Sequence, residues 1–583
     1  MKRLLYLSII IIVFGALLAL DLANRGLAWQ FAWWVSGEET PIAQARGVVE
    51  WAVSWTRPQP RTAALTPVRH TNVNPYGINT FLHMEVERDK VEAQLQMITA
   101  AGFTWIREQF PWEDLEVDGR GQFTDSRNDV TGDGVPDTIS SWDKYDRLVS
   151  LAEQYGVQIQ ARLDNPPAWS HAQNPGIGAF APPDDLQDFV NYAVAVAERY
   201  KGRIRYYQVW NEPNIYPEWG EQAVNPEAYT ELLCRTYDAL KAVDPEIVVI
   251  SGALAPTISL TGRDLSDTIF LQRMYQAGAG ECFDILSMQG YGLNSGPTDR
   301  RMRPTTINVA HNLYIRDLMV ANGDAHKPIW ITEAAWNSVP TEAEYPEPIS
   351  LRTAFGQVTQ QQAAAYMPRF YQRAQQEWPW VGVVNYWFFT RPSDAERNQS
   401  FYYFRMVEPD FNPDNEPPFT PLPVYDTMRT YINVQTPTLY RGVHQAAGHW
   451  AIDTAEEARV VRAEEATFGD AVETTRMTFV ADGTDVVIRW RGEALTVQID
   501  DGDAVQVDSE KSGEGWERTL LELGTLTEAR TLTLTSETPV TVESITVLDR
   551  TYQKVVPLLT IALVGGIMLV LSVMVGIRSR NMI

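Results

Sequence analysis

The chain has 583 residues, of which 48 are Lys or Arg and 74 are Asp or Glu, giving a formal net charge of −26. Hydrophobic residues make up 45% and charged residues 21%, a globular composition that excludes a disordered chain. So acidic a chain is a poor candidate for binding nucleic acid, which needs a basic surface, and two cysteines exclude a disulfide scaffold or a cysteine-rich zinc module.

The chain opens with an apolar run. Residues 4–20 carry no charge and follow Lys2 and Arg3. This pattern is typical of a signal peptide or a signal anchor, which we predict over residues 1–23. No small-x-small cleavage pattern follows directly, so an uncleaved anchor is favoured.

Residues 24–74 are predicted to connect this run to a folded domain. Residues 57–75 contain four prolines, as a spacer would. Five tryptophans lie close behind the apolar run and suit an aromatic belt at a membrane interface: Trp29, Trp33, Trp34, Trp51 and Trp55.

Residues 75–437 alternate between strand-like and helix-like segments. Eight short, nearly continuous apolar runs are typical of parallel strands covered on both faces: residues 76–81, 103–110, 157–164, 204–210, 247–254, 283–291, 328–334 and 381–389. Helical patterns follow each run, the first marked by Val91, Leu95 and Ile98. The eight repeats predict an α/β fold, a (β/α)₈ TIM barrel. A doubly wound open sheet is the alternative, but no Gly-rich phosphate loop follows the first predicted strand.

The active site of such a barrel lies at the C-terminal ends of its strands. Those ends are rich in carboxylates, amides and aromatic rings: Arg107, Asp164, Trp169, Asn211, Glu212, Gln289, Tyr291, Glu333 and Trp387. Two carboxyl groups at one mouth, Glu212 and Glu333, are what acid/base cleavage of a glycosidic bond requires. For either glutamate alone, a structural ion pair is the alternative.

Two strings at these ends resemble known signatures. VWNEPN at 209–214 and IWITEAAW at 329–336 strongly resemble the strand-four and strand-seven signatures of clan A glycoside hydrolases. The first is most similar to family 39, with family 5 the next match. The resemblance covers about residues 75–435, and two strings at the correct strands are a far more specific signal than one.

The resemblance implies a role for each site residue. Glu212 would be the general acid/base and Glu333 the nucleophile of a retaining double displacement. Arg107 would keep the nucleophile ionised, and Asn211 would hydrogen-bond the sugar 2-hydroxyl. Tyr291 would hydrogen-bond the nucleophile.

Two further positions complete the implied site. Trp387 would form the floor of the subsite that holds the cleaved sugar. Many relatives place His two residues before the strand-six Tyr, where this chain has Gln289. An amide can bond a hydroxyl but does not titrate near neutral pH, so the departure puts the identity of the substrate in doubt more than the mechanism.

The segment Asp129–Asp137 reads DVTGDGVPD and resembles the first half of a calcium loop. The glutamate expected at loop position twelve is replaced by Ser140. A structural calcium ion near this segment and an Asp/Gly-rich surface turn are therefore both open. We expect no metal in the active site.

Residues 438–550 change character. Short alternating stretches separated by turns predict a small all-β sandwich, which looks like the accessory carbohydrate-binding modules attached to such barrels. Three tryptophans could stack on sugars: Trp450, Trp490 and Trp516. A purely structural stalk is the alternative.

Residues 555–577 form a second apolar run, long enough to cross a hydrocarbon layer of about 30 Å. Arg578 and Arg580 follow it. Basic residues outside both apolar runs predict cytoplasmic ends and an extracellular domain at the cell membrane, with the lipid bilayer as partner. A buried core helix is the alternative for this run.

Together these features predict a membrane-anchored retaining glycosidase that hydrolyses O-glycosyl compounds. Its substrate would be a β-linked extracellular polysaccharide or oligosaccharide, and no cofactor is required. A glycan-binding or sensing protein on a catalytically silent barrel is one alternative. A transglycosidase with the same site residues is another.

Overall fold

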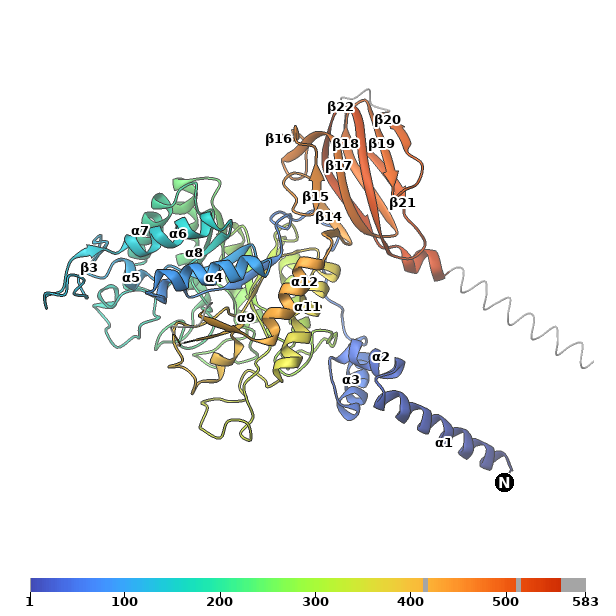
Figure 1. Cartoon of the computed structure of the whole chain (residues 1–583), viewed down its shortest axis with the longest axis horizontal. Helices are drawn as coiled ribbons and strands as arrows, with labels where there is room; N and C mark the ends of the chain where they lie inside the picture. Colours follow the sequence, from blue (N-terminus) through green and yellow to red (C-terminus); the bar gives the residue numbers. More distant parts are fainter. Residues whose placement is uncertain (1, 411, 413–417, 510–514, 557–583) are drawn as a thin grey trace, which may run out of the picture. The chain divides into compact units, whose positions relative to one another are not determined.

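The computed structural model describes residues 2–410, 412, 418–509 and 515–556. The chain divides into two compact units. One comprises Met1–Ala63, Pro75–Ala374 and Trp380–Gln435, and the other Ala64–Asn74, Gln375–Pro379 and Thr436–Ile583. Figure 1 labels most helices of the first unit and most strands of the second.

The first unit contains eight parallel strands in the order β7-β6-β5-β2-β1-β10-β9-β8. Two isolated parallel bridges, Ile250–Ile285 and Leu254–Met288, join β7 to β8. The strands therefore form a barrel, as predicted, and not an open sheet. Their bounds are β1 Tyr76–Asn79, β2 Trp105–Gln109, β5 Gln158–Leu163, β6 Tyr206–Val209, β7 Val248–Ile250, β8 Leu286–Gln289, β9 Ile329–Ala334 and β10 Val381–Tyr386.

Helices alternate with these strands because amphipathic segments follow each buried run (Figure 1). Asn225 caps one of them by accepting a hydrogen bond from the amide of Ala228. The helices are α4 Arg88–Ala100, α6 Trp142–Gln154, α7 Leu186–Arg199, α8 Pro226–Val243, α9 Asp267–Gln276, α10 Asn312–Ala321, α11 Gln360–Glu377 and α12 Pro423–Val434. The short helix α5 Trp112–Leu115 and the hairpin β3 Thr124–Asp125 with β4 Ile139–Ser140 lie between β2 and α6.

Three rings fill the barrel interior near the start of the strands. Trp105 and Trp330 lie 5.2 Å apart between ring centroids, and Tyr206 lies 4.9 Å from Trp105 and 5.1 Å from Trp330. The rings come from β2, β9 and β6, which are not neighbours, so they meet across the interior. This aromatic layer is a packed core, and polar side chains begin above it.

The N-terminal segment is helical. It forms α1 Lys2–Ala23, α2 Leu27–Ser36 and α3 Pro41–Ser54, so residues 24–74 contain two helices that sequence analysis did not predict. Within the described part of the chain, no single helix is long and apolar enough to cross a membrane. Residues 12–23 of α1 together with α2 satisfy that test as a pair bent by 64°. The predicted run 555–577 lies outside the described residues, except for its first two positions.

The second unit is an antiparallel-rich sheet that fits the predicted β-sandwich. The long strand β22 changes partners along its length: it pairs with β17 at residues 528–535 and 540–542, with β19 in its first half, and with β18 and β14 in its second half. The strands are β13 Thr438–Leu439, β14 Gly442–Gln445, β15 Ile452–Thr454, β16 Arg459–Arg462, β17 Asp470–Gly483, β18 Asp485–Arg491, β19 Ala494–Ile499, β20 Val505–Asp508, β21 Glu517–Glu522 and β22 Glu528–Leu548.

The three tryptophans of this unit have different environments. Trp490 is fully buried in the apolar core and donates from its indole to Thr519, so the interpretation that it stacks on sugars is wrong. Trp450 is partly buried against the same core. Trp516 contacts the guanidinium groups of Arg489 and Arg491.

The two cysteines form a disulfide. Cys234 of α8 is bonded to Cys282, 48 residues later and just after a short helical turn at Ala279–Glu281. Whether two cysteines 48 residues apart can pair depends on the fold, which brings their Cα atoms to 4.7 Å. The bond closes a loop that contains β7 and α9.

Removing this bond should destabilise the barrel. For a closed loop of this length, the lost restraint on the unfolded chain predicts that Cys234→Ser/Cys282→Ser lowers the free energy of unfolding by about 4 kcal/mol. Urea denaturation measures the difference. The wild-type protein treated with a reductant should unfold like the double variant, and equal stability with and without the bond would contradict the prediction.

Candidate active site

Glu333 lies at the end of β9, with its carboxylate held by two donors. Arg107 of β2 donates from Nη1 to Oε1 at 2.9 Å, and the hydroxyl of Tyr291 donates to Oε2 at 2.7 Å. Glu333 is only 5% exposed. A buried carboxylate is costly unless it is paired and hydrogen-bonded, and here both oxygens have a donor and one donor is a cation.

Arg107 connects Glu333 to a polar layer inside the barrel. Its Nη1 also donates to Asn79 at 2.8 Å, its Nε donates to Gln208 at 2.8 Å, and its Nη2 donates to Asn211 Oδ1 at 2.9 Å. These partners come from β1, β6 and the residues after β6. One guanidinium therefore sets the relative positions of side chains from four parts of the barrel.

Glu212 follows β6 where the backbone leaves the strand direction. Trp210 and Glu212 have φ values of 75° and 27°, in the region that costs a non-glycine residue about 1–3 kcal/mol. Asn211, between them, forms a parallel bridge with Ala253 of the next strand end. This strained turn directs the side chains of Asn211 and Glu212 to the same mouth as Glu333.

The environment of Glu212 favours the protonated form. Burial raises its pKa well above the usual range, and the negative charges of Glu333 and Glu218 raise it further, while Gln289 and Arg107 oppose the shift. Gln289 ends β8 and also accepts a hydrogen bond from Thr332 at 3.0 Å. The structure thus brings together one carboxyl group whose pKa is raised and a second that is held by a cation.

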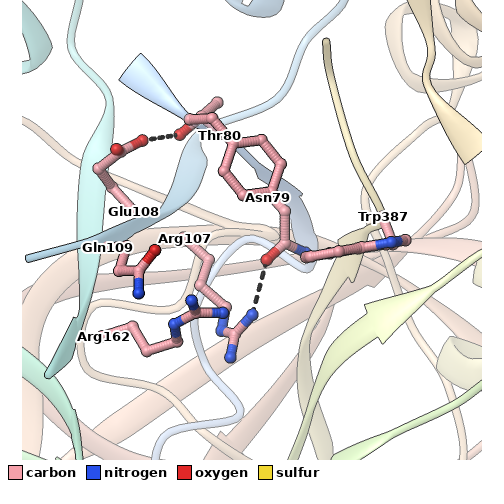
Figure 2. A pocket seen from close by; sticks show the side chains of 8 residues that line it. Asn79, Thr80, Arg107, Glu108, Gln109, Arg162 and Trp387 are labelled. Atoms are coloured by element: carbon pink, nitrogen blue, oxygen red, sulfur yellow. Dashed lines mark hydrogen bonds between the residues drawn. The ribbon is translucent and has the colours of Figure 1, made fainter. Parts of the chain in front are cut away.

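Trp387 follows β10 and lines a pocket beside Arg107 (Figure 2). Its ring packs edge-on against Phe81, with 5.6 Å between centroids. The other residues that line this pocket are Asn79, Thr80, Glu108, Gln109 and Arg162. All seven predicted site residues therefore lie at the C-terminal end of the barrel strands.

Two other strand-end candidates lie at the same mouth but bond to protein groups. Asp164 accepts from the amide of Gln109 at 2.7 Å and pairs with Arg162 at 2.7 Å. Trp169 donates from its indole to the carbonyl of Glu116 at 2.9 Å. The Trp169 hydrogen bond therefore stabilises a loop. The Arg162–Asp164 pair lies beside the pocket, which Arg162 lines.

Glu108 was not among the predicted site residues. This buried side chain accepts hydrogen bonds from Thr80 Oγ1 at 2.5 Å and from the amide of Leu82 at 3.1 Å, and it pairs with His83 Nδ1 at 2.6 Å. It fixes the loop after β1 that carries Phe81, whose ring packs edge-on against Trp387. Arg107, the preceding residue of β2, points to the barrel interior. The two-residue alternation of side chains along a strand was therefore the sequence signal that could have distinguished Glu108 from Arg107.

Sequence analysis also missed Glu218, which lies on the loop six residues after Glu212. Burial raises its pKa to about 7, against the lowering effects of Arg162 and of a hydrogen bond with Asn211. The charges of Asp164 and Glu333 raise it as well. No periodicity marks a loop residue, so only the folded structure identifies Glu218 as a third carboxyl beside the pair.

The Asp129–Asp137 segment, between β3 and β4, is closed by its own backbone. Asp129 accepts from the amides of Gly132 and Gly134, both at 2.6 Å, and Asp137 accepts from those of Val130 and Thr131, both at 2.8 Å. Among the described residues, no three His, Cys, Asp or Glu side chains come together as a metal site. A calcium ion here stays a prediction.

No protein-family model matches the chain. Over 219 residues it is 26% identical to an endo-1,4-beta-xylanase 5-like protein of Arabidopsis thaliana, an alignment that covers 36% of this chain and 34% of that protein. The chain thus spans about a third of the length of the curated relative it matches.

Similar solved structures include a family 39 glycoside hydrolase from Bacteroides cellulosilyticus WH2, at 17% identity, a TM-score of 0.45 and coverage of 81% of this chain and 83% of that chain. A monomeric beta-xylosidase from Caulobacter crescentus CB15 has 16% identity, a TM-score of 0.42 and coverage of 82% and 97%. A GH39 enzyme from Xanthomonas axonopodis pv. citri has 14% identity, a TM-score of 0.42 and coverage of 84% and 98%. Because these identities and TM-scores are low, a conclusion on function rests on the side chains at the barrel mouth.

The raised pKa of Glu218 predicts a pH-dependent stability. Since the folded chain binds this proton up to about pH 7 and the unfolded chain releases it near 4.5, the contribution is present at low pH and is lost as pH rises through 7. Glu218→Gln does not titrate. Between those pH values it should lose less stability than the wild type, by on the order of 3 kcal/mol. Urea denaturation at several pH values measures this, and parallel curves would contradict it.

Proposed function

We propose that this chain is a glycoside hydrolase that cleaves the O-glycosidic bonds of a β-linked glycan by a retaining double displacement. The observation that carries the proposal is the pair of unlike carboxyl environments. Glu212 is half-buried beside negative charge, and Glu333 accepts hydrogen bonds from a cation and a phenol. This division of roles between two carboxyl groups is what the reaction needs.

In the first step, a Glu333 oxygen attacks the anomeric carbon and the bond to the leaving-group oxygen breaks. Glu212 donates its proton to that oxygen, so the leaving group departs as a neutral alcohol. The product is a sugar esterified to Glu333. Glu333, now an ester, no longer carries the negative charge that Arg107 pairs with in the resting site. Glu212, which has given up its proton, is ionised.

In the second step, Glu212 takes a proton from a water molecule that attacks the same carbon. The ester bond to Glu333 breaks, and the free sugar keeps its original anomeric configuration. Both glutamates return to their starting states. The reaction requires no cofactor.

Three neighbours would bind and orient the sugar. The Oδ1 atom of Asn211 accepts from Arg107, and its amide nitrogen, which bonds Glu218, has a second hydrogen that can be donated to a sugar 2-hydroxyl. The Gln289 amide can bond another hydroxyl. Trp387 offers an aromatic face against which the apolar face of a sugar ring packs.

The substrate and the location belong to the same proposal. The motif resemblance and the xylanase-like name of the Arabidopsis thaliana relative support a β-linked polysaccharide or oligosaccharide. The two apolar runs, 4–20 and 555–577, support attachment to the cell membrane. The Cys234–Cys282 disulfide suits an oxidising compartment and thus an extracellular barrel.

Replacing Glu333 by Gln should abolish turnover without unfolding the barrel. The amide keeps the shape but cannot form the ester, so we expect kcat on an aryl β-glycoside to fall by at least about 10⁴-fold. A panel of aryl β-glycosides and polysaccharides, with circular dichroism as the folding check, measures this. Glu231→Gln on the outer surface of α8 is the matched control and should keep full activity. Wild-type rates in Glu333→Gln would contradict the assignment.

Replacing Glu212 by Ala should have a different effect. Substrates with good leaving groups need little proton donation, so their cleavage should survive, while hydrolysis of the glycan should fall by about 10³-fold. Azide, which needs no base, should restore turnover by attacking the sugar on Glu333. The azide product should retain the starting anomeric configuration, as nuclear magnetic resonance can determine, and an inverted product would contradict a nucleophilic Glu333.

A further inference from the structure

Helices α2 and α3 form a hairpin with two unlike faces. One face is buried and includes Trp29, Trp33 and Val35. The other exposes large apolar side chains to solvent: Leu27, Phe31, Trp34, Ile42, Val49, Val53 and Trp55. We call these seven residues the outer face. Clusters of exposed apolar side chains mark surfaces that contact a partner or a membrane.

Aromatic rings run continuously along this side of the hairpin. Phe31 lies 6.3 Å from Trp34 and 6.1 Å from Trp51, and Trp51 lies 5.9 Å from Trp55, measured between ring centroids. The guanidinium of Arg300 stacks on Trp34 at 4.2 Å. Tryptophan rings beside aliphatic side chains and arginine are the composition of segments that lie in the headgroup region of a bilayer.

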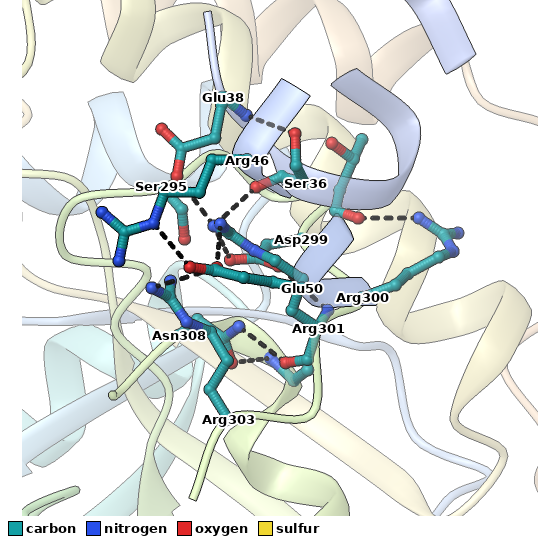
Figure 3. A network of polar contacts seen from close by, with 12 residues as sticks. Ser36, Glu38, Arg46, Glu50, Ser295, Asp299, Arg300, Arg301, Arg303 and Asn308 are labelled. Atoms are coloured by element: carbon teal, nitrogen blue, oxygen red, sulfur yellow. Dashed lines mark hydrogen bonds and ion pairs between the residues drawn. The ribbon is translucent and has the colours of Figure 1, made fainter. Parts of the chain in front are cut away.

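The hairpin is fastened to the barrel by one buried cation (Figure 3). Arg301, on the segment between β8 and α10, is 2% exposed. It donates to Glu38 at 2.8 Å, to Glu50 at 3.0 Å and to the carbonyl of Ser36 at 2.9 Å. Asp299 holds the same guanidinium at 2.8 Å. Three carboxylates and one carbonyl together offset the cost of burying this guanidinium.

Backbone contacts add to this attachment. The amide of Arg300 donates to the carbonyl of Val35 at 3.0 Å, and that of Gly296 donates to the carbonyl of Gly37 at 2.9 Å. Gly37 has a φ of 64°, and a Cβ there would lie 2.7 Å from the carbonyl oxygen of Gly296. Only glycine permits this approach, so the hairpin is a fixed part of the barrel unit and not a loose tether.

The outer face is also continuous with the apolar helix α1. Asp21, near the end of α1, accepts hydrogen bonds from the amides of Ala28 at 2.9 Å and Trp29 at 3.1 Å. This cap holds the start of α2 against the end of α1, and the two axes differ by 64°. In a bilayer, α2 is therefore turned away from the direction of α1 and does not continue along it.

We propose that the outer face of the α2–α3 hairpin lies in the headgroup layer of the bilayer and holds the barrel at a fixed orientation to the membrane surface. This inference rests on the proposed membrane attachment. The occupant is lipid because the face continues directly from an apolar helix. The catalytic mouth is thereby presented to glycan at a constant distance and angle from the lipid surface.

A matched pair of probes tests the contact. Both native cysteines are bonded, so an introduced cysteine is unique. Val49 on the outer face and Val130 on the β3–β4 loop are both 62% exposed. The full-length Val49→Cys and Val130→Cys chains are each labelled with an environment-sensitive fluorophore and reconstituted into phosphatidylcholine/phosphatidylglycerol vesicles that contain a nitroxide-headgroup lipid.

We expect the probe at residue 49 to be quenched at least about threefold more strongly than the probe at residue 130. Equal quenching in a chain that co-floats with the vesicles would overturn the hairpin inference alone. A chain that does not co-float would overturn the proposed membrane attachment itself. In detergent micelles, the fluorescence of the residue 49 probe is measured as well. A fluorescence change that follows protein concentration would point to a second copy, and one that follows added xylan would point to glycan. Either result would overturn the inference.

Discussion

The site depends on the compensation of one buried cation. Arg107 lies inside the barrel, where an unpaired guanidinium would be very costly, and its bonds to Glu333, Asn79, Gln208 and Asn211 offset that cost. These partners belong to strands that meet only when the barrel closes. The contacts that offset the cost of burying Arg107 therefore also place Glu333 and the amide of Asn211 beside Glu212.

The polarity of the barrel interior follows from the two-residue period of a strand. Along β2, Trp105 joins the aromatic layer, Arg107 the polar layer and Gln109 the pocket wall. One strand thus passes from a dry core to a polar mouth in five residues. The packed rings below exclude water from the base of the site, so the charges above them act in a medium of low polarity.

Much of this arrangement could be predicted because it depends on short stretches of sequence. Nearly continuous apolar runs identified the eight strands, and the strings around Glu212 and Glu333 identified the two strand ends with carboxyl groups. The α2–α3 hairpin was missed because its five tryptophans suggested an aromatic belt at a membrane interface within a connector. In the structure Trp29 and Trp33 are buried and Trp34 is exposed, a division that the composition of the segment does not reveal.

The sequence by itself determined the order of strands and helices and the residue types at each strand end, because backbone periodicity and turn chemistry act between near neighbours. The tertiary structure alone decided the roles of Glu108 and Glu218, the Cys234–Cys282 bond and the burial of Arg301. These depend on desolvation and charge between groups far apart in the chain. Such terms exist only once folding has removed water and brought the groups within a few ångströms.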